Sequence, residues 1–168
     1  YLKLKISNIL DRKINIFIPF MFLIFIFCQI AIGAFVSGMD AGKIYNSWPL
    51  MGSTYFPNDN NLVNLFKLSA FNDPSLVQFI HRNLAYIILI FYIFVLVKIY
   101  KNKISNLYFA VNILGVLLII QIILGILTIL YGAQIFLASM HQISSIFLVT
   151  SSIYFVYLNL NTNLQLSD

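Results

Sequence analysis

The sequence predicts an all-α, polytopic membrane protein built as a bundle of four transmembrane helices. Hydrophobic residues make up 61% of the 168 residues and charged residues only 9%, whereas a soluble domain carries about 25% charged residues. Four apolar stretches are each long enough to cross a lipid core, which takes about 20 helical residues. We place these spans at about 15–39, 76–99, 107–131 and 135–158, with an outer loop at 40–75. Residues 1–168 are expected to form one membrane domain.

Lysine and arginine set the expected orientation, because cytoplasmic or matrix loops carry an excess of both. The two lysine- and arginine-rich segments are the N-terminal tail and the second connection, with Lys3, Lys5, Arg12, Lys13, Lys98, Lys101 and Lys103. We therefore expect both termini on the cytoplasm or matrix side of a bacterial cell inner membrane or a mitochondrial inner membrane. The lipid bilayer is the first expected partner. The net charge of +5 is explained by topology, and no nucleic-acid partner is expected.

Few residues in this chain can do acid or thiol chemistry. The sequence has no glutamate, and its acids are Asp11, Asp40, Asp59, Asp73 and Asp168. This excludes most chemistry that needs two carboxylates at one site. The single cysteine, Cys28, lies inside the first apolar run. It cannot form an internal disulfide, and we expect a buried, inert thiol with a packing role.

A short repeat links the first and third spans. The segment QIAIG begins at Gln29, and QIILG begins at Gln121, at a matching depth in each span. The chain is therefore predicted to be two helical hairpins in a tandem parallel repeat, and such repeats place a shared site at their interface. The glutamines are expected to form hydrogen bonds between helices. Gly33 and Gly125 are expected to allow close helix approach.

The second and fourth spans each carry one histidine, His81 and His141, and the chain has no other. Each lies about 8–9 Å inside the outer end of its span. Since both spans run from outside to inside, the two imidazoles can face each other. This arrangement fits axial ligation of a heme iron, whereas zinc needs three or four ligands. The alternative is that each histidine is a hydrogen-bonded residue of the membrane core.

Arg82 follows His81 directly and stays charged in proteins. It can reach the membrane surface, pair with Asp40 or Asp73, or bind a ligand carboxylate such as a heme propionate. Small residues near the histidines leave room for a flat macrocycle or for helix packing, and these are Ala85, Ala138, Ser144 and Ser145.

Three segments resemble the C-terminal half of the heme A synthase family, in its mitochondrial and alphaproteobacterial form. They are GAFVSGMDAGKIYNSWPLMG at 33–52, FNDPSLVQFIHRNLAY at 71–86 and LASMHQ at 137–142. The resemblance covers nearly the whole chain but about half of the family's protein, which is an eight-helix tandem repeat of two four-helix units. It implies an oxidoreductase that converts a methyl group of heme O to the formyl group of heme A for cytochrome oxidase.

The resemblance also implies a division of labour. This half would hold heme b as a bis-histidine complex of His81 and His141, with Arg82 beside it, while the N-terminal half would hold the substrate heme O. We therefore expect no catalytic residue in this chain and no turnover by it alone. The N-terminal half, in the same or a separate chain, is the implied partner. A homo-oligomer is compatible with this, and the electron-transfer partner is unknown.

The resemblance has two departures, Asn72 and Ile80, which stand where relatives often have an acid and a polar residue. Two other functions remain open at this point. One is a membrane b-type cytochrome that transfers electrons without methyl oxidation. The other is a structural membrane protein without heme.

Overall fold

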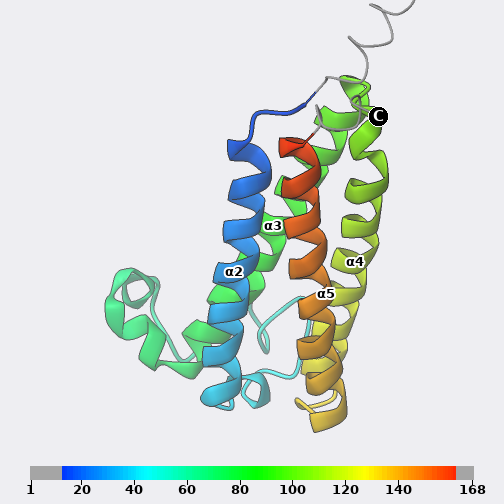
Figure 1. Cartoon of the computed structure of the whole chain (residues 1–168). Coiled ribbons are helices and arrows are strands. Elements are labelled where there is room, and N and C mark those ends of the chain that lie inside the picture. Colours follow the sequence, from blue (N-terminus) through cyan, green and yellow to red (C-terminus); the bar gives the residue numbers. More distant parts are fainter. Residues whose placement is uncertain (1–12, 162–168) are drawn as a thin grey trace, which may run out of the picture.

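The computed structural model describes residues 13–161, and within them four long helices form a bundle (Figure 1). The helices are α2 (Phe17–Gly38), α3 (Pro74–Lys101), α4 (Tyr108–Leu130) and α5 (Ile135–Leu160). Each is long and apolar enough to cross a membrane, which confirms the predicted all-α membrane fold. The tail residues Lys3, Lys5 and Arg12, used for the predicted orientation, lie outside the described residues.

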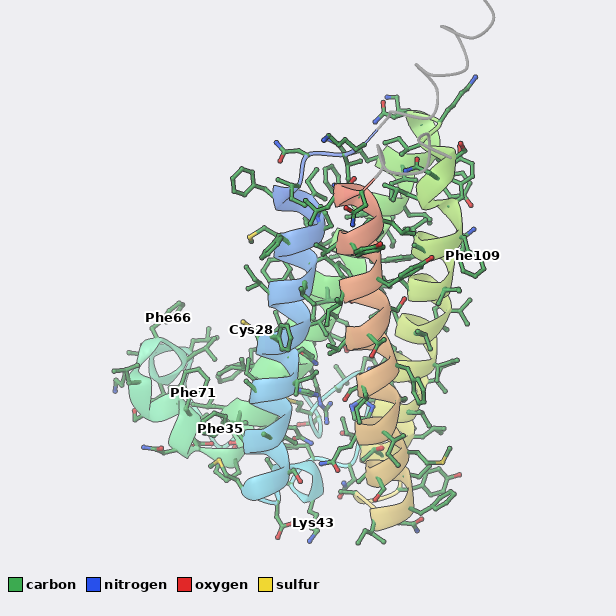
Figure 2. The ribbon with its side chains drawn as sticks, viewed as in Figure 1. Cys28, Phe35, Lys43, Phe66, Phe71 and Phe109 are labelled. Carbon is green, nitrogen blue, oxygen red and sulfur yellow. The ribbon has the colours of Figure 1, made fainter. Side chains whose placement is uncertain are left out.

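The helices are apolar on all sides, and many large side chains point away from the bundle. Phe109 projects from α4 in Figure 2, and it is 66% exposed. Cys28 on α2 is also exposed (Figure 2), so the predicted buried thiol is wrong. The physical reason is that a membrane helix carries apolar residues toward lipid as well as toward protein. An apolar neighbourhood in the sequence therefore does not place a residue in the core.

The bundle is assembled from two hairpins, α2 with α3 and α4 with α5, and α2 also packs against α5. The core between them is filled by large side chains, among them Phe22, Ile88, Tyr92, Leu114 and Phe155. Gly115 of α4 faces Tyr92 of α3, and a Cβ at Gly115 would lie 1.9 Å from the tyrosine oxygen. Any larger residue at this position would therefore require the Tyr92 side chain or the helices to shift.

We call one end of the bundle the loop end, because it carries the connection 39–73 and the turn 131–134. The connection was predicted as an outer loop, and it contains three short 3-10 helices: η1 (Ala41–Lys43), η2 (Leu62–Phe66) and η3 (Leu68–Asn72). Helices η2 and η3 form an arm beside the bundle, where Phe66 and Phe71 are labelled in Figure 2. The ring of Phe71 lies 6.0 Å from that of Phe35 on α2.

We call the opposite end the terminal end. The first described residues and the end of α5 meet there. The Ile14 N–H donates to Asn159 Oδ1 at 3.0 Å, and Asn159 Nδ2 donates to the Ile14 carbonyl at 3.0 Å. Both residues are buried, so the segment before α2 is fixed onto the bundle.

Candidate functional site

The structure brings the two predicted histidines together. His81 on α3 and His141 on α5 have ring centroids 6.5 Å apart and ring planes at 79°. One ring comes from each hairpin, so the pair lies at the interface of the repeat. This position agrees with the depth argument from the sequence, because both residues lie toward the loop end of their helices.

Each histidine is held by a glutamine of the helix before it. Gln29 of α2 places its Nε2 3.3 Å from His81 Nε2 and donates to the His81 carbonyl at 3.1 Å. Gln121 of α4 places its Nε2 3.5 Å from His141 Nε2 and donates to the His141 carbonyl at 2.9 Å. The predicted interhelical role of the glutamines is confirmed. That the histidine is their partner was not foreseen.

A glycine one turn after each glutamine lies against the same ring. A Cβ at Gly33 would lie 3.2 Å from His81 Cε1, and a Cβ at Gly125 would lie 3.0 Å from His141 Cε1. Each glycine therefore leaves room for the imidazole of the next helix, and the close helix approach expected at these glycines stays a prediction. We call Gln29, Gly33 and His81 the first unit, and Gln121, Gly125 and His141 the second unit.

Polar groups in the two units are not equally satisfied. In the second unit, Ser144 donates to Gln121 Oε1 and to the His141 carbonyl, the latter at 3.0 Å. In the first unit, Gln29 Oε1 is buried and has no partner among the described residues. The Nδ1 atoms of both histidines are likewise buried without a partner there. An unpaired buried polar atom costs free energy, so this is where a bound group would add stability.

Arg82 is buried, with 6% of its surface exposed, and it binds the connection at the loop end through backbone carbonyls. Its Nη1 donates to Ser47 O at 2.8 Å and to Leu50 O at 3.3 Å, and its Nη2 donates to Tyr45 O at 2.9 Å. Its Nε is buried and has no partner among the described residues. The loop is thus tied to the residue that follows His81.

The suggested pairing of Arg82 with Asp40 or Asp73 is wrong. Asp40 pairs with Lys43 at 2.8 Å. Asp73 Oδ1 accepts hydrogen bonds from the Ser75 and Leu76 N–H groups at 3.0 and 3.2 Å. Both carboxylates therefore have nearer donors, and the carbonyls of a folded loop take their place at Arg82.

Other side chains of α3 hold the same loop. Gln78, one turn before Arg82, donates to the Tyr45 carbonyl at 3.1 Å. The Trp48 indole donates to Tyr86 Oη at 3.0 Å, and Tyr55 Oη donates to Asn83 Oδ1 at 2.6 Å. The four-residue spacing of Gln78 and Arg82 puts them on one helix face. That spacing was a signal in the sequence for a shared partner.

Asp73 begins the helix that carries His81. Burial acts to raise the pKa of its carboxyl, but hydrogen bonds from Asn60, Ser75 and the first turn of α3 outweigh burial and lower the pKa below its usual value. Pro74 takes the first helical position, where its missing N–H is not needed. Helix α5 has no such side-chain cap at Gln134, so the two histidine helices start differently.

The paired imidazoles are suited to holding one metal ion between them. No group of three or more His, Cys, Asp or Glu side chains that could hold a metal occurs within residues 13–161. A site here would therefore have two protein ligands, with the remaining coordination positions supplied by the bound group. This is the coordination pattern of a bis-imidazole heme.

The fold and this site define an integral membrane protein with a histidine pair shared by two helical hairpins. The family model of the cytochrome oxidase assembly protein matches residues 7–153. The chain therefore belongs to the cytochrome oxidase assembly protein family.

Curated relatives of the chain carry the name heme A synthase. The protein of Pelagibacter ubique is 43% identical over 156 residues, which is 90% of this chain and 45% of that protein. The protein of Roseobacter denitrificans is 38% identical over 118 residues, 70% of this chain and 31% of that protein. The protein of Rickettsia bellii is 37% identical over 150 residues, 87% of this chain and 44% of that protein. The chain thus spans about half the length of the curated relatives it matches. No solved structure matches it.

Proposed function

We propose that this chain is the heme-binding half of a heme A synthase, with His81 and His141 as the two axial ligands of a heme b. The observation that carries the proposal is the pair of imidazoles at the hairpin interface, with ring centroids 6.5 Å apart. Membership in the cytochrome oxidase assembly protein family and the names of the relatives support it.

The spacing of the rings fits a shared metal ion. A metal–imidazole bond is about 2.0–2.1 Å long, so two rings on one ion have centroids roughly 6–6.5 Å apart. The observed 6.5 Å lies at this value. Each ring also has a buried Nδ1 without a partner among the described residues. The site therefore combines a ring separation that fits a shared metal ion with ring nitrogen atoms that have no partner among the described residues.

The glutamines can support the rings whether or not a metal is bound. Each amide is closer to the backbone carbonyl of its histidine than to the ring nitrogen, at 3.1 against 3.3 Å and at 2.9 against 3.5 Å. The amide can therefore stay on the carbonyl while the ring turns toward another partner. The absence of a Cβ at Gly33 and Gly125 leaves space for that turn.

The proposal extends to Arg82 as a cofactor-binding residue. Its Nη atoms hold the loop, and its Nε remains a donor without a partner among the described residues. No carboxylate within residues 13–161 pairs with it, although a carboxylate is the usual partner of a buried guanidinium. Heme carries two propionates, and a propionate would compensate this charge. When bound, the heme would supply one-electron transfer or structural support beside the substrate site.

The full enzyme is proposed to oxidise a methyl group of heme O to the formyl group of heme A for cytochrome oxidase. Because this chain spans about half of its relatives, we place the heme O site and the catalytic residues in the N-terminal half. That half, in the same or a separate chain, is the proposed partner. The proposed setting is a bacterial cell inner membrane or a mitochondrial inner membrane, with both termini on the cytoplasm or matrix side.

The absorption spectrum of the purified chain, loaded with heme, tests the cofactor. We expect the bands of a low-spin, bis-imidazole heme at one heme per chain. A protein that is folded by circular dichroism and shows no such bands refutes heme binding.

An activity assay then tests the division between the two halves. The 168-residue chain alone is expected to form no heme A from heme O, and addition of the four-helix N-terminal half should restore the reaction. Heme A formed by this chain alone would contradict the assignment. A heme-loaded chain that stays inactive with that partner favours the b-type cytochrome instead.

A further inference from the structure

The terminal end of the bundle carries a basic groove of about 670 Å³, which is within the size range of ligand pockets. Three lysines line it from two directions. Lys98 and Lys101 come from the last turn of α3, and Lys13 comes from the segment before α2. The amide side chain of Asn15 also lines the groove. We use the name basic groove for this set.

The groove is held in shape by buried contacts. Lys13 precedes Ile14, which exchanges two backbone hydrogen bonds with the side chain of Asn159 at 3.0 Å each. Ile14 and Asn159 are 3% and 2% exposed. Lys98 is placed by its own contact, since its Nζ lies 5.6 Å from the centroid of the Phe94 ring. The backbone next to Lys13 is thus fixed by buried hydrogen bonds, and the Lys98 ammonium is placed against the Phe94 ring.

The positive charge in the groove has no internal counterion among the described residues. Within residues 13–161 the acids are Asp40, Asp59 and Asp73, and all three belong to the connection at the loop end. Lysines at a helix C-terminus are favoured by the helix dipole, which explains Lys98 and Lys101 in part. It does not explain why Lys13 from another segment converges on them.

The depth of the groove matches the headgroup region of a bilayer. It lies beside the start of α2 and the end of α3, two of the membrane-length helices. The stacked rings of Tyr100 and Tyr108, with centroids 4.4 Å apart, lie on either side of the connection between α3 and α4, at the same end of the bundle. Tyrosines of this kind concentrate where the membrane meets water.

We propose that the basic groove binds the phosphate of an anionic phospholipid headgroup. An ammonium group is a compact charge with three donors, which suits phosphate oxygens. Basic pockets between membrane helices on the cytoplasmic or matrix side have this ligand chemistry. Free phosphate has the same oxygens, so the test must separate the two sources. This site is distinct from the histidine pair and does not rest on its function.

Native mass spectrometry of the full chain in detergent tests the proposal, with phosphatidylglycerol and phosphatidylcholine of the same acyl chains as the probes. The wild-type chain should bind phosphatidylglycerol in preference. Each lysine near a membrane surface strengthens binding of an anionic lipid roughly fivefold. The double variant Lys98→Gln/Lys101→Gln should therefore bind phosphatidylglycerol roughly thirty-fold more weakly.

The matched control is Lys43→Gln/Lys67→Gln, which removes the same charge at the loop end. It should keep the preference for phosphatidylglycerol, as should Lys98→Arg/Lys101→Arg. Lys13 lies outside the helices, so Lys13→Gln tests the groove if the double variant does not fold. This variant should also bind phosphatidylglycerol more weakly than the wild-type chain. Equal losses in the groove and control variants, or no loss in the groove variants, overturn the proposal. Displacement of the lipid by millimolar inorganic phosphate overturns the lipid assignment.

Discussion

The first and second units repeat the same contacts, yet they are supported differently. In both, a glutamine reaches the histidine of the next helix and a glycine lies against its ring. The glutamine of the second unit is fixed by Ser144, whereas Gln29 Oε1 of the first unit has no partner among the described residues. Next to the first unit, Arg82, the residue after His81, binds the loop. The two units therefore share the contacts of glutamine and glycine with the histidine. The contacts that support those residues differ between the two hairpins.

The largest expected effect comes from removing either imidazole. We predict that His81→Ala and His141→Ala each abolish the bis-imidazole heme bands, because one remaining ring cannot supply both axial ligands. The measurement is the absorption spectrum and the heme-to-protein ratio of the purified variants. Gln142→Ala, next to His141 and exposed, should keep the bands. Bands that persist in both histidine variants would refute the ligand assignment.

The next effect should separate the two units. Gly125→Ala is predicted to lower heme content more than Gly33→Ala, since the added Cβ would lie 3.0 Å from His141 Cε1 but 3.2 Å from His81 Cε1. Valine at either position should lower it further. The control is Gly38→Ala on α2, where a Cβ would meet nothing within 4 Å. A larger loss at Gly33 than at Gly125 would contradict the prediction.

A third effect concerns the loop that Arg82 binds. Arg82→Met should lower the free energy of unfolding by roughly 2–4 kcal/mol, because the loop loses its hydrogen bonds to a charged donor. Thermal unfolding and limited proteolysis of residues 44–52 measure it. Gln78→Leu, which frees the same Tyr45 carbonyl, should loosen the loop without moving the heme reduction potential. If the heme reduction potential is also unchanged in Arg82→Met, that result would argue against a contact between Arg82 and a heme propionate.

The smallest expected effect is a pH dependence of the free energy of unfolding that comes from Asp73, the N-cap of α3. Hydrogen bonding lowers the pKa of Asp73 in the folded state, so its contribution to stability is present above the unfolded value of about 3.9 and is lost as the pH falls through the folded value. Asp73→Ala should cost about 0.5–2 kcal/mol at neutral pH, as for other N-caps. Thermal unfolding from about pH 5 down to about pH 2 should show a loss of stability that this variant lacks. Asp40→Asn, in an exposed ion pair, should keep this loss.

The four helices were predictable from the sequence because backbone polar groups in lipid must form hydrogen bonds within the protein, and a helix of apolar residues satisfies them. Observed helices at 17–38, 74–101, 108–130 and 135–160 lie close to the predicted spans. The matching depth of His81 and His141 was also predictable from the 1.5 Å rise per residue, whereas their facing each other depends on helix rotation as well. Both arguments rest on a periodic helix crossing a slab of fixed thickness.

Other features could not be read from the sequence for physical reasons. Cys28 faces outward, and no pattern of polar and apolar residues marks the outer face of a helix surrounded by lipid. The partner of Arg82 is a set of backbone carbonyls at Tyr45, Ser47 and Leu50. Backbone carbonyls occur at every residue, so only the folded loop selects these three. The glutamine–histidine contacts depend on helix rotation, which sequence spacing alone leaves undetermined.

The hydrogen bonds between Ile14 and Asn159 have a consequence for how such units can be joined. They show that the segment before α2 and the end of α5 meet at the same end of the bundle, the terminal end. With an even number of crossings, a second copy of the unit can follow on the same chain through a short linker and enter the bilayer in the same direction. Duplication of this unit therefore yields parallel copies, and an inverted pair would require an additional span.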